Sequence, residues 1–396
     1  MRHLAIGFAI AVFSVHGAMA QDKSAKPSSA KPPSAKPSPD KAMADYHKKQ
    51  KECTAARAKH EAVAVPYWSR VGEMRQARIA KRRAGQPVAL SDYVLEQPPL
   101  YTGPACPRDP SVRQEDQPDD KPELPVVADF LRNAKEYFNF EPEQAKEVDF
   151  KRAYVKIASD AGITRDQIVR IYSFETGGNG RYDAQAGLIF NKPNARAIST
   201  ALGYNQLLTA NTTSLLAGKG DRFVKVLQAR AAGLSGEQRK ELERKIDILK
   251  RKVAFSKSVP ERWSDHVKLA RTQKGLALHA LNLDIDIGPL LQTRKLLDSV
   301  RFAKVKAIDR TLTAAELEMM NLTGDGNGFD MLSLTPEMRA QVPTANFFQR
   351  LGYERNPIAI RTKVVEKLIA ETNAVMDNRS QADGAKDLAR LLERSE

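Results

Sequence analysis

The sequence predicts a mainly α-helical protein. Apolar residues recur three and four residues apart in several segments, for example between Phe150 and Ala161 and between Val364 and Thr372, and strand-like alternation is almost absent. Hydrophobic residues make up 42% of the chain, which is enough for a core. Because 396 residues exceed one typical domain, we expect one large helical domain with appendages, or two domains.

The first 20 residues have the pattern of a secretory signal peptide. A short basic start is followed by an apolar run from Leu4 to Val15 and by the small residues of a cleavage site, Ala18-Met19-Ala20. The apolar run is too short to span a bilayer, so we expect no membrane-spanning segment in the mature protein. We expect cleavage after Ala20 and a periplasmic or secreted protein. The net charge of +15 then points to anionic wall polymers as the partner, and not to nucleic acid.

The segment after the signal is expected to form a linker and an arm. Residues 21–42 repeat Ser-Ala-Lys-Pro, which favours an extended, solvated linker. Residues 43–84 favour a basic helix, and residues 85–125, rich in proline and acidic side chains, are expected to be extended. In an oxidising compartment Cys53 and Cys106 most simply form a disulfide that ties this extended segment to the helix. The alternative is two unpaired thiols.

One glutamate breaks the apolar pattern of a predicted helix over residues 165–175. Glu175 lies four residues after Ile171 and three after Tyr172, so it points to the same apolar side. Burial and the helix C-terminus both disfavour the charged carboxylate and raise its pKa. Because Gly177 is suited to end the helix, Glu175 is expected at the rim of a pocket. A carboxylic acid that stays protonated there suits general acid catalysis. The alternative is a glutamate that turns outward in a frayed last turn.

Four short motifs follow in order along the chain. They are Glu175-Thr176, Ala201 to Leu207, Asn282 to Gly288, and Met320-Asn321 followed by Gly324 and Gly326. In these motifs the chain resembles the soluble lytic transglycosylase family, which has a lysozyme-like helical fold. It departs from the family pattern at Met320, where the family has a tyrosine, and in the longer interval between Glu175 and Gln206.

The resemblance implies a lysozyme-like helical domain, and composition places an extended, proline-rich N-terminal arm before it. We expect the arm at residues 43–125 and the domain at residues 126–376. The long interval between the second and third motifs leaves room for a helical insertion at about residues 211–280. Residues 377–396 are expected to form a C-terminal tail.

The resemblance also implies an activity on peptidoglycan glycan strands. In this family one glutamate acts as acid and then as base, cleaving the β-1,4 bond between N-acetylmuramic acid and N-acetylglucosamine and leaving a 1,6-anhydromuramic end. Glu175 would be this catalytic residue, and no cofactor or metal is implied. The expected substrate-binding residues are Thr176, Gly203, Tyr204, Gln206 and Asn321. We see no second acid at an obviously paired position, and the sequence does not indicate which cell-envelope protein could be a partner.

Two other functions stay open. One is a non-catalytic peptidoglycan-binding protein on the same fold, and the other is a hydrolase of the lysozyme type. Asp183 is the nearest candidate for a base that activates water, although a solvated loop position explains it as well. Gly203 could serve close packing and Gln206 could cap a local turn. The stretch from Asp325 to Asp330 lacks a complete set of calcium ligands and is expected to be a glycine-rich turn.

Overall fold

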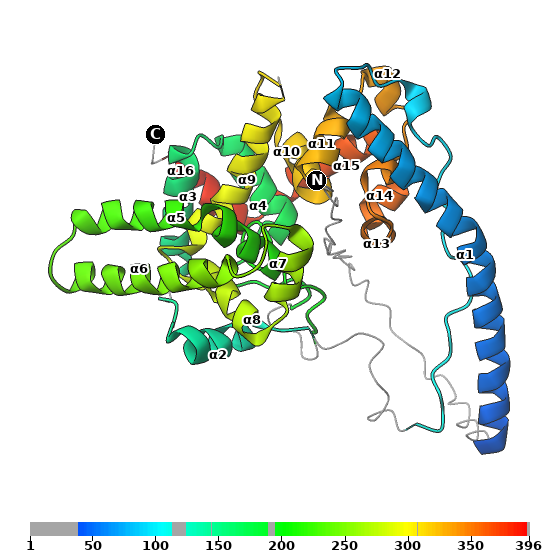
Figure 1. The fold of residues 1–396 in the computed structure, drawn as a ribbon, viewed down its shortest axis with the longest axis horizontal. Helices are drawn as coiled ribbons and strands as arrows, with labels where there is room; N and C mark the ends of the chain where they lie inside the picture. Colours follow the sequence, from blue (N-terminus) through cyan, green and yellow to red (C-terminus); the bar gives the residue numbers. More distant parts are fainter. Residues whose placement is uncertain (1–38, 113–123, 144, 189–194, 307, 394–396) are drawn as a thin grey trace, which may run out of the picture. The chain divides into compact units, whose positions relative to one another are not determined.

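The computed structural model describes residues 39–112, 124–143, 145–188, 195–306 and 308–393 (Figure 1). Within these residues the regular elements are 16 α-helices and three short 3-10 helices, with isolated β-bridges and no strands. The predicted mainly α-helical class is therefore confirmed. The expected signal peptide and residues 21–38 of the expected linker lie outside the described residues. None of the helices described is long and apolar enough to cross a membrane.

The described residues divide into two compact units. The first, residues 39–112, consists of α1 (Pro39–Arg83) and an arm that contains the short 3-10 helix η1 (Leu90–Asp92). Because α1 begins at Pro39, the last residues of the expected linker are helical. The buried positions of α1 recur at spacings close to multiples of the helical turn; they are Cys53, Ala64, Tyr67, Val71, Arg75 and Arg78. Such a spacing places one stripe of the helix against a partner.

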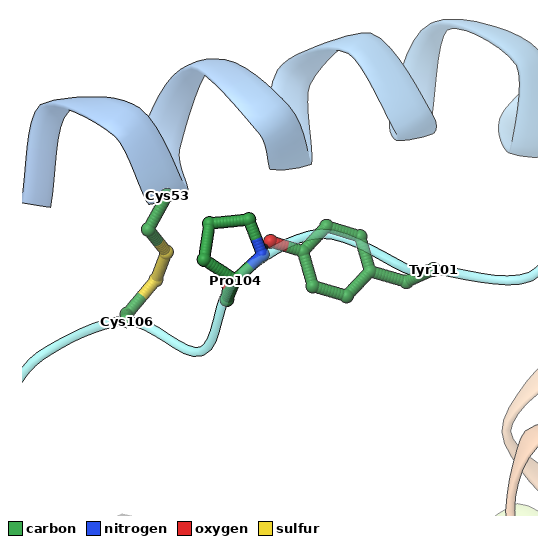
Figure 2. The surroundings of a disulfide bond; sticks show 4 residues. All are labelled: Cys53, Tyr101, Pro104 and Cys106. Carbon is green, nitrogen blue, oxygen red and sulfur yellow. A yellow bond between two sulfur atoms is a disulfide. The ribbon is translucent and has the colours of Figure 1, made fainter. Parts of the chain in front are cut away.

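The arm runs back along this stripe of α1. Tyr67 donates a hydrogen bond to the carbonyl of Glu96 (3.0 Å), and Arg78 donates one to the carbonyl of Asp92 (3.0 Å). The disulfide between Cys53 and Cys106 joins the arm to the helix, as predicted (Figure 2). On the chain-entropy estimate, closing a loop of this length contributes about 4 kcal/mol. The arm is thus fixed along the helix by hydrogen bonds and one covalent bond.

The second unit, residues 124–393, holds the remaining helices. They are α2 (Val127–Phe138), α3 (Glu147–Asp160), α4 (Arg165–Thr176), α5 (Thr209–Ala232), α6 (Gly236–Ser256), α7 (Trp263–Ala270), α8 (Gln273–His279), η2 (Ala280–Leu283), α9 (Gly288–Val305), α10 (Ala314–Thr323), α11 (Asp325–Leu332), α12 (Pro336–Arg339), η3 (Thr344–Phe347), α13 (Arg350–Glu354), α14 (Pro357–Thr362), α15 (Val365–Arg379) and α16 (Asp383–Glu393). The helices α3, α10, α15 and α16 all pack against α4. This arrangement makes α4 the central helix of the unit.

The helices α5 and α6 form a long hairpin in the region for which an insertion was expected (Figure 1). Buried charges hold this hairpin to the turn before α9. Lys245 of α6 is almost wholly enclosed, and its ammonium lies 2.7 Å from Asp286, 3.4 Å from Asp284 and 2.5 Å from Glu143. Arg230 of α5 reaches Asp286 from the surface at 2.6 Å. We call Lys245, Asp284, Asp286, Glu143 and Arg230 the lysine cluster.

Two expected loops are helices instead. The stretch from Asp325 to Asp330 begins α11, whose packing on α10 outweighs the low helix propensity of its glycines. The expected tail forms the end of α15 and then α16. Ala385, Leu388 and Leu392 are buried at intervals of three and four residues, so α16 has an apolar face that packs on α3 and α4. The expected C-terminal tail therefore ends in a helix that packs on the rest of the unit.

Candidate functional site

The helix α4 begins and ends as its sequence predicts. Thr164 accepts a hydrogen bond from the backbone of Gln167 (3.2 Å), and the Gln167 side chain accepts one from the backbone of Thr164 (3.0 Å). This reciprocal capping satisfies two amide groups that the first turn leaves without partners. At the other end, Gly177 takes a left-handed conformation with φ of 76°. Glu175 is therefore held in the last regular turn.

The next glycine brings the end of α4 against the end of α15. Gly178 has φ of 80°, and a Cβ atom built on it would lie 2.2 Å from the carbonyl oxygen of Arg379. Both the conformation and the close approach require glycine at this position. From the same helix end, Arg379 donates a hydrogen bond to the carbonyl of Phe174 (2.6 Å). The last turn of α4 is thus clamped by α15, and a frayed end is avoided.

The Glu175 side chain faces the interior, as predicted. Only 8% of the residue is exposed, and its Oε1 accepts a hydrogen bond from Nδ2 of Asn321 on α10 (2.8 Å). Burial raises the pKa of Glu175 to about 8, although hydrogen bonds from Glu318 and Asn321 and the charge of Arg379 oppose the shift. Burial therefore favours the protonated form of Glu175 near neutral pH.

A second acid, Glu318, meets Glu175 in the core. It lies on α10 and is 0% exposed, and it lies close to Glu175 because Nδ2 of Asn321 is within 3.5 Å of Oε1 of both acids. Burial, and then the charge of Glu175, raise the pKa of Glu318 well above its usual range. The expectation that no second acid is paired with Glu175 was wrong. We call Glu175 and Glu318 the glutamate pair.

The pair needs a proton to be stable. Apart from the other carboxyl group, Oε2 of each acid has no hydrogen-bond donor among the residues described. Nor does either glutamate form a salt bridge within this part of the chain. Two carboxylates cannot hydrogen-bond each other, since both only accept. At least one of the two carboxyl groups is therefore protonated.

Asn321 connects both acids. Its Nδ2 atom lies 2.8 Å from Glu175 Oε1 and 3.5 Å from Glu318 Oε1. Because Glu318 and Asn321 are three residues apart on α10, they share one face of that helix. Met320 points elsewhere and packs against Gly328 of α11, where a Cβ would lie 2.5 Å from the Met320 Cα. The predicted proximity of Glu175 and Asn321 is therefore found in the structure.

Thr176 and Tyr204, both expected to contact substrate, have structural partners. The Thr176 hydroxyl donates to the carbonyl of Tyr172 (2.7 Å) and closes the last turn of α4. Tyr204 is completely buried, packs edge-to-face on Tyr172, and donates its hydroxyl proton to Glu147. Its ring faces other core side chains, so this structure places it where no sugar can stack on it.

Gly203 and Gln206 shape the turn around Tyr204. Gly203 has φ of 81°, and a Cβ atom there would lie 2.7 Å from Nε2 of Gln292, so close packing explains this glycine. The Gln206 side chain donates to the carbonyls of Gly203 (2.8 Å) and Ala184 (3.2 Å). It caps the local turn and makes no hydrogen bond to Glu175. Of the expected substrate-binding residues, only Asn321 contacts the catalytic candidate.

Glu318 could have been found by its spacing. It precedes Asn321 by one helical turn and stands directly between Leu317 and Met319 in a segment whose residues are all buried. An acid among apolar residues of a helix is expected to be buried, as Glu175 is. Within the described ranges no group of histidine, cysteine or acidic side chains is suited to a metal ion. Two buried carboxyl groups and an amide are suited to proton transfer instead.

The comparisons with known proteins do not extend this description. No family model matches the chain, and neither a curated protein nor a solved structure is found to be similar to it.

Proposed function

We propose that the protein is an exported peptidoglycan lytic transglycosylase with a lysozyme-like domain. The observation that carries the proposal is a buried Glu175 whose carboxyl accepts a hydrogen bond from Asn321 and whose pKa burial raises to about 8. A protonated carboxyl near neutral pH is what a general acid needs to act on a glycosidic oxygen. The four ordered motifs and the signal-like N-terminus support the choice of glycan strands as substrate.

In the first step Glu175 gives its proton to the oxygen that joins N-acetylmuramic acid to N-acetylglucosamine. The bond between this oxygen and C1 of the muramyl sugar breaks, and the leaving sugar carries the proton away as a hydroxyl group. Glu175 becomes a carboxylate. Asn321 remains hydrogen-bonded to it, which stabilises the new charge.

In the second step the muramyl C6 hydroxyl oxygen attacks C1 and closes the 1,6-anhydro ring. The hydroxyl proton passes to the Glu175 carboxylate and restores the acid. No water is consumed, and one residue performs both transfers. Because the nucleophile belongs to the substrate, the enzyme needs no second carboxylate across the glycan.

The geometry of the glutamate pair argues against a lysozyme-type hydrolase. Inverting enzymes hold their two carboxyl groups about 6.5–9.5 Å apart to admit water, and retaining enzymes about 5–5.5 Å apart around the sugar. Glu175 and Glu318 lie together in the core beside Asn321, and Glu318 is 0% exposed, so the two acids do not face each other across a bound sugar. The other candidate base, Asp183, is paired with Arg181 at 3.2 Å.

Digestion of purified sacculi, followed by mass spectrometry, tests the proposal. The expected products carry 1,6-anhydromuramic ends, and Glu175→Gln abolishes their release. Asp183→Asn is the matched control and should release the same products as the wild type. Reducing muramic ends would establish a hydrolase, and sacculi that bind the protein without any release would establish a binding protein; either result contradicts the proposal.

A further inference from the structure

The glutamate pair is unequal in its access to solvent. Glu175 exposes 8% of its surface and Glu318 exposes none, so Glu318 is the more completely enclosed of the two acids. Glu318 is enclosed by the apolar residues of α10 and by the helices α4, α9, α11 and α15 that pack against α10. A buried carboxylate without an ion pair is costly, and a group in that position keeps its proton. Of the two acids, Glu318 is therefore the one expected to keep its proton.

We propose that Glu318 is a positioning residue that stays protonated and donates a hydrogen bond to Glu175 throughout the reaction. Its catalytic significance rests on the proposed function, but its protonation does not. The geometry supports the assignment: Asn321 reaches Oε1 of both acids, and Oε2 of each acid is buried without a hydrogen-bond partner among the described residues. A neutral Glu318 supplies the donor that Oε2 of Glu175 lacks.

Charged groups on the neighbouring helices do not reverse this assignment. Lys295 of α9 favours the ionised form of Glu318, but its ammonium lies 3.6 Å from the carboxylate of Asp325, which offsets part of its charge. Arg379 of α15 acts on Glu175 and favours its carboxylate. The nearest cationic influences therefore help Glu175 to ionise more than they help Glu318.

This arrangement favours the first task of Glu175, the release of its proton to the leaving oxygen. When Glu175 loses its proton to the leaving oxygen, its carboxylate receives two hydrogen bonds, one from Asn321 and one from the Glu318 hydroxyl. Hydrogen bonds to a charged acceptor are stronger than those to a neutral one, so they favour the transition state in which the charge develops. Glu318 gives up no proton, and the cycle ends when Glu175 takes the C6 hydroxyl proton.

Two substitutions test whether Glu318 acts as a neutral hydrogen-bond donor or as a base that gains and loses a proton. Glu318→Gln keeps the shape and a donor, so activity on sacculi should stay within about tenfold of the wild type. Glu318→Leu removes the donor, and kcat should fall by about 100-fold or more, as when one donor to a developing anion is lost. The pKa of Glu175 should also rise in Glu318→Leu, so the basic limb of the pH–rate profile should move to higher pH.

Infrared difference spectra between the wild type and Glu318→Gln give a readout that needs no activity. At neutral pH the spectrum should show the loss of a protonated carboxyl band. Loss of a carboxylate band would overturn the proposal, as would a Glu318→Gln variant as inactive as Glu175→Gln, or a Glu318→Leu variant with wild-type kcat and pH profile. If the wild type failed to cleave sacculi, the proposed function would fail while the infrared result would still decide the state of Glu318.

Discussion

The second unit contains two groups of buried acids that differ in one respect. In the lysine cluster, Asp284 and Asp286 lie against the ammonium of Lys245. In the glutamate pair, Glu175 and Glu318 lie against each other and form no salt bridge among the described residues. The first group joins the α5–α6 hairpin to the turn before α9. The second group has no salt-bridging cation among the described residues, and burial favours its protonated form, so the two groups differ in how they offset burial.

The lysine cluster shows how a cation offsets burial. Burial alone lowers the pKa of Lys245, but the charges of Asp284 and Asp286 and the hydrogen bond to Glu143 outweigh it and raise that pKa. Burial raises the pKa of Asp284, and the charge of Lys245 opposes this shift. The lysine therefore stays charged, and its charge removes much of the penalty of enclosing the aspartates.

The largest effect is expected from Lys245→Met, which converts the lysine cluster to the type without a cation. Removing one partner of a buried ion pair typically costs about 3–5 kcal/mol of unfolding free energy, because the other charge is left uncompensated. Urea unfolding measures this loss. Lys240→Met, at an exposed position of the same helix, is the control and should change stability by less than about 0.5 kcal/mol. Equal stabilities for Lys245→Met and Lys240→Met would show that the buried lysine does not stabilise the aspartates around it.

The next effect is expected from Glu175→Gln on stability. The folded pKa of about 8 lies above the usual value of 4.5, so the folded protein binds a proton that the unfolded chain releases between these values. The resulting stability is fully present below pH 4.5 and is lost as the pH rises through about 8. Because a glutamine side chain does not titrate, the Glu175→Gln variant does not lose this stability as the pH rises. At alkaline pH the variant should exceed the wild type by on the order of a few kcal/mol, since each pKa unit corresponds to 1.36 kcal/mol.

Unfolding of the wild type and Glu175→Gln in urea at several pH values checks this sign. The two proteins should have similar stability in acid and should diverge as the pH rises. A wild type that gains stability relative to the variant between weakly acidic and alkaline pH would show that Glu175 is ionised and stabilised in the folded state.

A smaller effect is expected from Asn321→Ala. This change removes the 2.8 Å hydrogen bond to Glu175, and one hydrogen bond to a buried group contributes about 1 kcal/mol to stability. Because Asn321 lowers the pKa of Glu175, its loss should raise that pKa and shift the basic limb of the pH–rate profile upward. An unchanged profile would mean that Asn321 does not contact the carboxylate during the reaction.

The smallest effect is expected from Arg230→Ala. Arg230 is bonded to Asp286 at 2.6 Å, but more than half of its side chain is exposed, so water replaces the lost contact. Such pairs contribute about 0–1 kcal/mol. Urea unfolding should place this variant close to the wild type and far from Lys245→Met. A loss as large as that of Lys245→Met would show that both cations are needed.

The sequence predicted what local patterns determine. The helical class, the two ends of α4 and the inward direction of Glu175 all follow from the spacing of apolar, capping and glycine residues. The contact between Glu175 and Asn321 was anticipated from the order of the motifs. The first three depend on residues within a few turns of one another. The last depends on the order of the motifs in the family that the sequence resembles.

Other features depend on packing between distant segments, and the sequence did not reveal them. Tyr204 could equally have been a surface platform, and only the positions of Tyr172 and Glu147 around it decide that it is buried. Glu318 is paired with Glu175 because α10 crosses α4, which no local spacing predicts. Its spacing from Asn321 was a signal, but the partner was 143 residues away.

Burial in a pair of acids that forms no salt bridge is expected to keep Glu175 protonated at neutral pH. Carbon-13 NMR of protein labelled at the glutamate carboxyl carbons measures this directly, with Glu175→Gln and Glu318→Gln to assign the two signals. The account predicts that both signals have the shift of the protonated acid at neutral pH and that the Glu175 signal titrates with a pKa of about 8. If instead both carboxyl groups were already ionised at neutral pH, the account would be contradicted.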